Sequence, residues 1–221
     1  SIGQLGRLAE RLKAHRVEHA VMAGKVTKEV LFDPRVQFDA EALAIIGRVK
    51  EYSVNSLLGA IGEFLATHGV TLLDSSTFLK DSLCPSGPVT RRGPTQEEED
   101  DIHVGITAAR QLAQLDVGQT VVVKRRVIVA VEALEGTDAT IERAGRVGGP
   151  GGVVVKMASP TQDMRFDLPV VGAQTIAGAV AAGIRCLAIE AGKALLLDRE
   201  AVVRQADEAG MCLVGIVPPA P

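Results

Sequence analysis

The sequence predicts an α/β protein with a truncated Rossmann-like α/β domain at its N-terminus and a mixed α/β domain at its C-terminus. Helical and strand-like hydrophobic patterns alternate along the 221-residue chain, as they do where helices pack on a sheet. Between the two halves, residues 84–94 contain three prolines and two glycines, a composition typical of a linker. The predicted domains are therefore 1–84 and 95–221, with a linker at 85–94.

In the first half, apolar residues three or four positions apart predict helices, and short unbroken apolar runs predict strands. The helical pattern covers 5–13, 40–50 and 56–68, and the strand-like runs cover 20–24 and 70–74. Because helices separate the two strands, we expect the strands to be parallel.

A helix is predicted directly after the linker. Thr95 and Glu98 have the spacing of a capping box, and the acids at 97–101 suit the positive end of a helix as a solvated first turn. This helix should end near Leu115. The remaining predicted elements are a hairpin of 120–123 with 127–131, strands at 153–156, 186–189, 194–197 and 212–217, and helices at 173–182 and 199–209.

Composition excludes several classes of function. A net charge of −3 gives no nucleic-acid footprint, and five Phe, one Tyr and no Trp leave little for stacking on bases or sugars. No apolar run approaches the roughly 18 residues of a membrane span, so any membrane contact should be peripheral. The three cysteines are widely spaced, which favours reduced thiols in the cytoplasm.

The first candidate site is the segment Glu135-Gly136-Thr137-Asp138, which follows an apolar strand. Gly136 permits a tight turn, and Thr137 or Asp138 can cap a helix that begins near Ala139. A helix N-terminus beside a glycine can bind phosphate. An ordinary capped turn between a strand and a helix explains the same residues.

The second candidate site lies between Pro160 and Pro169. In an extended chain, Asp163, Arg165 and Asp167 would share one face. Two carboxylates can hold a hard cation or activate water, and an arginine can bind phosphate. An exposed, salt-bridged strand remains the alternative. Further along the chain, Lys193 is either a hairpin lysine or a cation near the site.

Four motifs in order carry a family resemblance, which extends more loosely over the rest of the chain. They are Asp116–Val123, Ala130–Asp138, Gln162–Pro169 and Ala188–Lys193. The chain resembles the UDP-2,3-diacylglucosamine pyrophosphatases of lipid A biosynthesis, of the type unrelated to calcineurin-like enzymes.

This resemblance implies hydrolysis of UDP-2,3-diacylglucosamine to UMP and 2,3-diacylglucosamine 1-phosphate. It also implies a divalent cation such as Mg²⁺, a substrate held between two domains, a homodimer, and a cytoplasmic location at the inner face of the inner membrane. The family's essential aspartate corresponds to Asp167, which we expect to bind the metal or position water. Glu135, Asp138 and Asp163 are supporting candidates, and Arg165 or Lys156 would offset phosphate charge.

The chain also departs from the family pattern. Members usually have a strand and a glycine-rich turn before the point where this sequence starts, so we expect an N-terminally incomplete domain. Lys25 stands where many members have Asn, and Ser159 where Lys is common. These departures keep open a noncatalytic nucleotide- or lipid-binding protein of the same fold.

Overall fold

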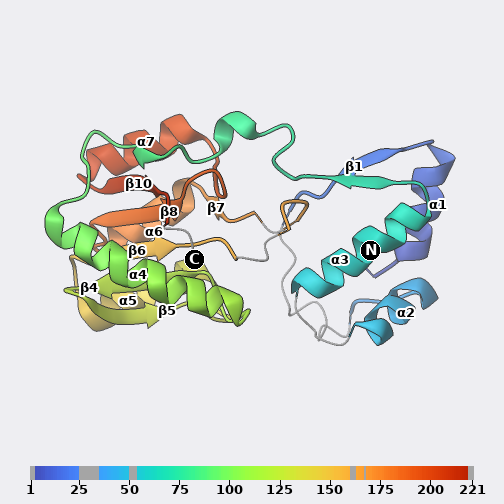
Figure 1. The fold of residues 1–221 in the computed structure, drawn as a ribbon, viewed down its shortest axis with the longest axis horizontal. Coiled ribbons are helices and arrows are strands. Elements are labelled where there is room, and N and C mark those ends of the chain that lie inside the picture. The colour runs from blue at the N-terminus through green and yellow to red at the C-terminus, as the bar shows by residue number, and fades with distance from the viewer. Residues whose placement is uncertain (1–2, 25–34, 50–53, 160–162, 167, 219–221) are drawn as a thin grey trace. The chain divides into compact units, whose positions relative to one another are not determined.

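The computed structural model describes residues 3–24, 35–49, 54–159, 163–166 and 168–218 (Figure 1). These residues form two compact units. The first unit contains the described residues between Ser1 and Phe78 together with those between Gln162 and Asp167, and the second contains the rest. A short piece of chain from the second half of the sequence thus belongs to the first unit.

The first unit has a small parallel sheet with three helices. Strands β1 (His19–Val21) and β2 (Thr71–Leu73) pair in parallel, as the sequence predicts. The helices are α1 (Leu5–Ala14), α2 (Ala40–Arg48) and α3 (Val54–Thr67). Two small apolar clusters hold these elements together, one around Ile45 and the other around Leu65.

The second unit is built on a six-stranded sheet with the order β3-β10-β8-β6-β4-β5. Its strands are β3 (Gly87–Pro88), β4 (Thr120–Lys124), β5 (Val127–Val131), β6 (Val153–Lys156), β8 (Cys186–Glu190) and β10 (Cys212–Ile216). Strands β6, β8 and β10 are parallel, whereas β3, β4 and β5 are antiparallel to their neighbours. The sheet is therefore mixed, as the sequence predicts.

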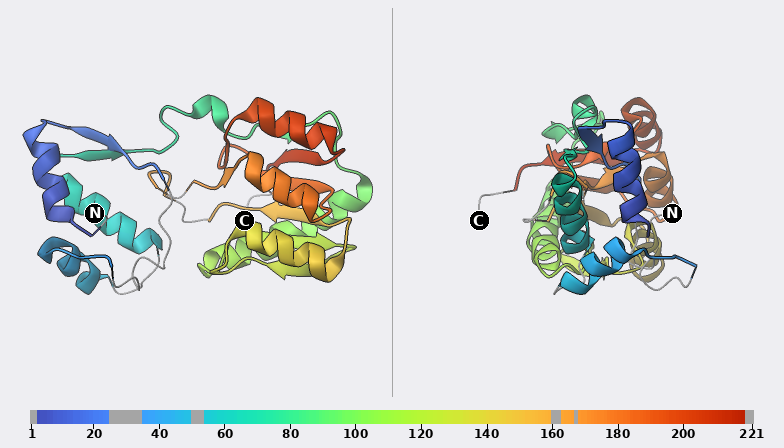
Figure 2. Two further views of the ribbon diagram at one scale, coloured as in Figure 1. Left: turned by 180° about the vertical axis from the view of Figure 1, so that it is seen from behind. Right: turned by 90° about the vertical axis from the view of Figure 1, so that its right-hand side faces the viewer.

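Helices cover both faces of this sheet (Figures 1 and 2). One face packs on α4 (Gln96–Gln114), and the other packs on α5 (Thr137–Gly148), α6 (Ala173–Ala181) and α7 (Arg199–Glu208). The strand residues alternate between the two apolar cores: Val154 contacts the core on the side of α5, and Val155 the core on the side of α4. This alternation follows from the two-residue repeat of a strand.

The capping box at the start of α4 is confirmed. The Thr95 hydroxyl accepts a hydrogen bond from the Glu98 backbone N–H at 3.3 Å, and the Glu98 carboxylate accepts one from the Thr95 N–H at 2.8 Å. The Arg92 guanidinium also bonds the Glu98 carboxylate, at 2.7 and 3.0 Å. These bonds satisfy a largely buried glutamate at the helix start.

Residues 85–94, predicted as a linker, lie within the second unit. They contribute β3, which pairs with β10, and the Thr90 hydroxyl accepts a hydrogen bond from the Leu213 N–H at 2.9 Å. Strand β10 admits this close approach at Gly215, where an added Cβ would lie 1.7 Å from the Pro85 carbonyl oxygen. Proline suits such an edge strand because it has no N–H to donate.

Two other short elements were not predicted. They are a 3-10 turn, η2, at Lys80–Ser82, and strand β7 (Val170–Val171). Strand β7 pairs in parallel with β9 (Leu195–Leu196), which lies within the strand predicted at 194–197. No helix among the described residues is long and apolar enough to cross a membrane.

Candidate functional site

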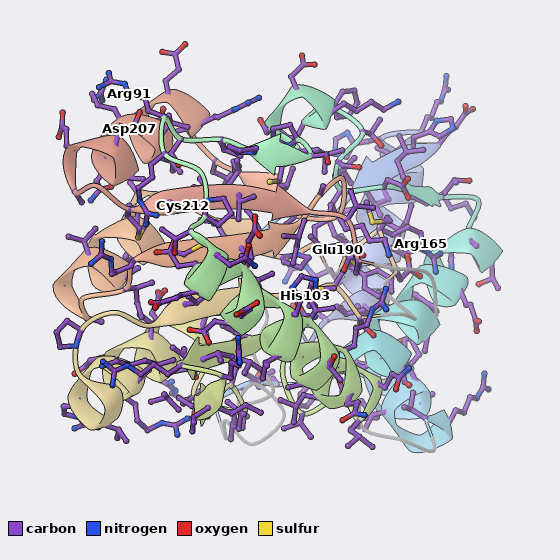
Figure 3. The ribbon with its side chains drawn as sticks, turned by 60° about the vertical axis from the view of Figure 1, so that its left-hand side comes forward. Arg91, His103, Arg165, Glu190, Asp207 and Cys212 are labelled. Carbon is purple, nitrogen blue, oxygen red and sulfur yellow. The ribbon has the colours of Figure 1, made fainter. Side chains whose placement is uncertain are left out.

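Several candidate residues meet at one edge of the six-stranded sheet, where the parallel strands end. Lys156 is the last residue of β6, and Glu190 is the last residue of β8, labelled in Figure 3. The neighbouring strand β4 runs in the opposite direction, so its first residue, Thr120, lies beside Lys156. Ligands of open α/β sheets bind at this carboxyl edge.

Lys156 is the centre of a buried polar cluster. Its ammonium donates to the hydroxyl oxygens of Thr137, at 2.8 Å, and Thr120, at 3.2 Å. The Glu132 carboxylate lies 3.9 Å from the ammonium and accepts a hydrogen bond from Thr137 at 2.8 Å. The Gln119 N–H also donates to this carboxylate, at 3.2 Å. A buried cation thus lies directly behind the first residue of α5.

The charge of Glu132 depends on these partners. Burial acts to raise the pKa of this carboxyl group. The Lys156 ammonium and the hydroxyl and N–H donors around the carboxylate outweigh burial, so the pKa of Glu132 lies below its usual value. The cluster therefore holds a carboxylate and an ammonium together in a largely buried place.

The turn at 135–138 differs in part from the prediction. Helix α5 begins at Thr137, and its N-cap is Gly136 with φ 84°, so neither Thr137 nor Asp138 caps a helix that starts later. A glycine reaches this left-handed conformation without the strain of a side chain. The Thr137 hydroxyl bonds into the Lys156 cluster instead.

The two acids of this turn bond elsewhere. The Glu135 carboxylate accepts from Arg143 at 2.5 Å and from the Ala133 N–H at 3.2 Å. The Asp138 carboxylate accepts from the Thr175 hydroxyl, in the first turn of α6, at 3.2 Å. The structure thus brings Thr137 to Lys156, whereas the carboxylates of Glu135 and Asp138 bond to other groups.

Glu190 and Lys193 form a second pair at the same edge. Their side chains lie 2.9 Å apart, and the Glu190 carboxylate also accepts from the Ala158 N–H at 3.0 Å. Glu190 is buried, whereas the Lys193 side chain is half exposed. Glu190 therefore holds the backbone at Ala158, two residues after β6 ends.

Residues 163–166 form a turn rather than the predicted extended strand. The Asp163 carboxylate accepts from the Arg165 N–H at 3.0 Å, and the Phe166 N–H donates to the Asp163 carbonyl oxygen at 3.2 Å. An aspartate side chain that bonds the backbone two residues on favours such a turn. The prediction of side chains alternating along a strand was wrong because it omitted this local bond.

Within this turn, Asp163 and Arg165 form an ion pair. The guanidinium donates from Nε at 2.9 and 3.1 Å and from Nη2 at 2.6 Å. These hydrogen bonds lower the pKa of Asp163. Asp167, the predicted catalytic acid, and Lys25 lie outside the described residues.

The turn belongs to the first unit through contacts with helix α3 and the loop after β2. The Arg165 guanidinium lies against α3 at Gly62, where an added Cβ would be 3.2 Å from Nη1. The Ser75 N–H donates to the Met164 carbonyl oxygen at 2.9 Å. Arg165, labelled in Figure 3, is thus held by first-unit residues although it lies ninety positions after Ser75 in the sequence.

Comparison with known proteins matches both halves of the chain to one family. The LpxI N-terminal domain matches residues 1–82, and the LpxI C-terminal domain matches residues 85–214. The chain belongs to the LpxI family. The UDP-2,3-diacylglucosamine pyrophosphatase LpxI of Caulobacter vibrioides is 31% identical over 229 residues, which covers 98% of this chain and 81% of that protein.

The LpxI domain boundary and the structural units agree near residue 80 but not at the 163–166 turn. This turn lies inside the range matched by the C-terminal domain, yet it packs in the first unit. The C-terminal domain sequence of this LpxI-family chain therefore supplies a part of the first unit.

Two members of the buried cluster, Thr120 and Glu132, were missed as functional candidates. The hairpin predicted from the sequence could have indicated them. Its pairing places Thr120, at the start of β4, beside Glu132, which directly follows β5. A bulge between Val122 and Val123 shifts the register, and the Glu132 N–H bonds the Thr120 carbonyl oxygen at 2.8 Å. Sequence periodicity does not show such a shift in this LpxI-family chain.

The described residues of this LpxI-family chain contain no group of three or more His, Cys, Asp or Glu side chains suited to a metal. The carboxylates of Asp163, Glu132 and Glu190 are each paired with a basic side chain. Magnesium needs only one or two carboxylates when substrate phosphates supply other oxygen ligands. A site of that kind does not require a cluster of three protein ligands.

Proposed function

We propose that this chain hydrolyses the pyrophosphate bond of UDP-2,3-diacylglucosamine and releases UMP and 2,3-diacylglucosamine 1-phosphate. The observation that carries this proposal is the relationship to the Caulobacter pyrophosphatase, which extends over 98% of the chain. It includes both LpxI domains, so it does not depend on one shared motif.

The buried cluster supports a phosphate site at the start of α5. The N–H groups of the first helical turn point out of the helix, and the helix dipole favours an anion there. Gly136 supplies no capping side chain, and the Lys156 ammonium lies behind Thr137 at 2.8 Å from its hydroxyl. A phosphate at this place would meet N–H donors in front and a positive charge behind them.

We assign the reacting acid to Asp167, with Asp163 and Arg165 in the same loop as supporting residues. Asp167 and Asp163 would hold a Mg²⁺ ion together with phosphate oxygens of the substrate. Such a metal would offset the charge on the phosphates and polarise the bond to the leaving group. Arg165 would add positive charge, and its pairing with Asp163 keeps the guanidinium oriented.

We further propose that the protein is a cytoplasmic homodimer with peripheral contact to the inner face of the inner membrane. Its three cysteines are free and buried, which suits a reducing compartment. Light scattering would test the dimer, and fractionation of cells with and without a salt wash would test the location.

Release of UMP by the purified protein tests the activity. UDP-2,3-diacylglucosamine should be cleaved with Mg²⁺ and not with EDTA, and Asp167→Asn should lose at least about 10²-fold in kcat. The control is Asp81→Asn, which changes an exposed carboxylate in the η2 turn. Binding of the substrate with no UMP release would instead favour a noncatalytic nucleotide- or lipid-binding protein.

A further inference from the structure

Ser75 joins three separate parts of the first unit. It lies two residues after β2, at the edge where both parallel strands of this unit end. Its hydroxyl lies 2.9 Å from the carbonyl oxygen of Met22, which follows β1, and 2.6 Å from the carbonyl oxygen of Arg165. Its N–H donates to Met164 at 2.9 Å. One residue thus bonds both strand ends to the 163–166 turn.

The bonds from Ser75 hold the turn by its backbone. Backbone contacts fix where the turn lies, whereas the Asp163–Arg165 pair and the Phe166 N–H bond fix its internal shape. The hydroxyl has one proton to share between two carbonyl oxygens, and the shorter contact is to Arg165. Loss of this hydroxyl would therefore act first on the position of Arg165.

We propose that Ser75 is a positioning residue for the catalytic loop. It would act through the turn that presents Arg165 and leads directly into Asp167. This inference rests on the proposed function. In this view, a residue of the first unit holds a loop that belongs to the C-terminal domain in sequence. A displacement of about 1 Å in a reacting group can cost about 10²-fold in rate, so a single anchoring bond matters at this place.

The same loop contains a matched control. The Thr77 hydroxyl donates to the Asp74 carbonyl oxygen at 2.6 Å, a bond that stays inside its own turn. Thr77→Val therefore removes a hydroxyl two positions from Ser75 without touching the 163–166 turn. Both variants lose one side-chain hydrogen bond to a carbonyl oxygen, but only Ser75→Ala loses a bond to the 163–166 turn.

The experiment compares Ser75→Ala, Ser75→Thr and Thr77→Val in UMP release and in backbone hydrogen exchange, well below the melting temperature. We expect Ser75→Ala to lower kcat by about tenfold to a hundredfold with a much smaller change in KM. Hydrogen exchange at 163–166 should become faster. Ser75→Thr keeps a hydroxyl and should recover most of the activity, and Thr77→Val should match the wild type in both measurements.

A folded Ser75→Ala variant with wild-type kcat and wild-type exchange at 163–166 would overturn the inference, as would an equal loss in Thr77→Val. If Ser75→Ala does not fold, Ser75→Cys carries the same test, because a thiol keeps the shape and is a weaker donor. Absence of UMP release by the wild type would count against the proposed function. Faster exchange at 163–166 in Ser75→Ala would still support the anchoring role in that case.

Discussion

The two units hold their charged candidate residues in different ways. In the second unit, the Lys156 and Glu132 side chains are 8% and 12% exposed and lie at the edge of a large sheet. In the first unit, whose sheet has two strands among the described residues, the Arg165 and Asp163 side chains are 35% and 28% exposed. Both are pairs of one acid and one base. They differ in burial, and also in contact, because the Lys156 ammonium is 3.9 Å from Glu132 whereas Arg165 bonds Asp163 at 2.6 Å.

This difference in burial predicts which substitutions reduce stability and which reduce mainly activity. In a buried ion pair, each charge interacts with its partner instead of with water. Loss of one partner therefore leaves the other charge without solvation. A partly exposed charge can be solvated by water when its partner is lost, so such a pair contributes little to stability. We therefore expect changes at Lys156 to affect folding and catalysis together, and changes at Asp163 to affect mainly catalysis.

The largest effect is expected for Lys156→Met. This change leaves the Glu132 carboxylate buried with its hydroxyl and N–H donors but with no cation at 3.9 Å. The free energy of unfolding should fall by about 3 kcal/mol, the usual cost of breaking a buried pair. Urea unfolding followed by circular dichroism would measure this loss.

Two variants test the explanation. Glu132→Gln combined with Lys156→Met removes both charges and should recover part of the lost stability. Arg126→Met breaks an exposed pair with Asp100 and should leave the unfolding free energy nearly unchanged. An equal loss of unfolding free energy in Lys156→Met and Arg126→Met would show that burial does not determine how much these ion pairs contribute to stability.

Local patterns in the sequence predicted much of this arrangement. The capping box of Thr95 and Glu98 depends on residues three positions apart, and the hairpin of β4 and β5 depends on two adjacent apolar runs. Thr137 was recognised as part of a turn that follows an apolar run. These features are fixed by neighbours in the chain, so periodicity and residue type are enough to find them. Lys156, by contrast, became a candidate only through the family resemblance.

The missed features depend on contacts between distant residues or on a single local bond. The register shift between β4 and β5 places Glu132 opposite Thr120, and no composition rule gives the position of this shift. The turn at 163–166 forms because the Asp163 side chain bonds the Arg165 N–H, which competes with the extended form. Its anchor at Ser75 is ninety residues away in the sequence, and only the folded first unit brings the two together.

A smaller effect is expected in acid. Because the pKa of Glu132 is below its usual value in the folded protein, its charge contributes stability above its unfolded pKa of about 4.3. That contribution is lost as the pH falls through the folded pKa. Urea unfolding between pH 7 and pH 3 should show a steeper decline for the wild type than for Glu132→Gln. Identical slopes would mean that the Lys156 cluster does not hold this carboxylate in its charged form.

Only a small change in stability is expected for Asp163→Asn, although its activity should fall. The amide oxygen can still accept from the Arg165 N–H, so the turn keeps its backbone bond while the guanidinium loses its charged partner. The free energy of unfolding should change by less than about 1 kcal/mol, because both side chains of the pair are partly exposed. Calorimetry and UMP release on the same preparation would measure both quantities. A loss of stability as large as that of Lys156→Met would contradict the contrast between the units. It would show that water does not solvate the Arg165 guanidinium once its charged partner is removed.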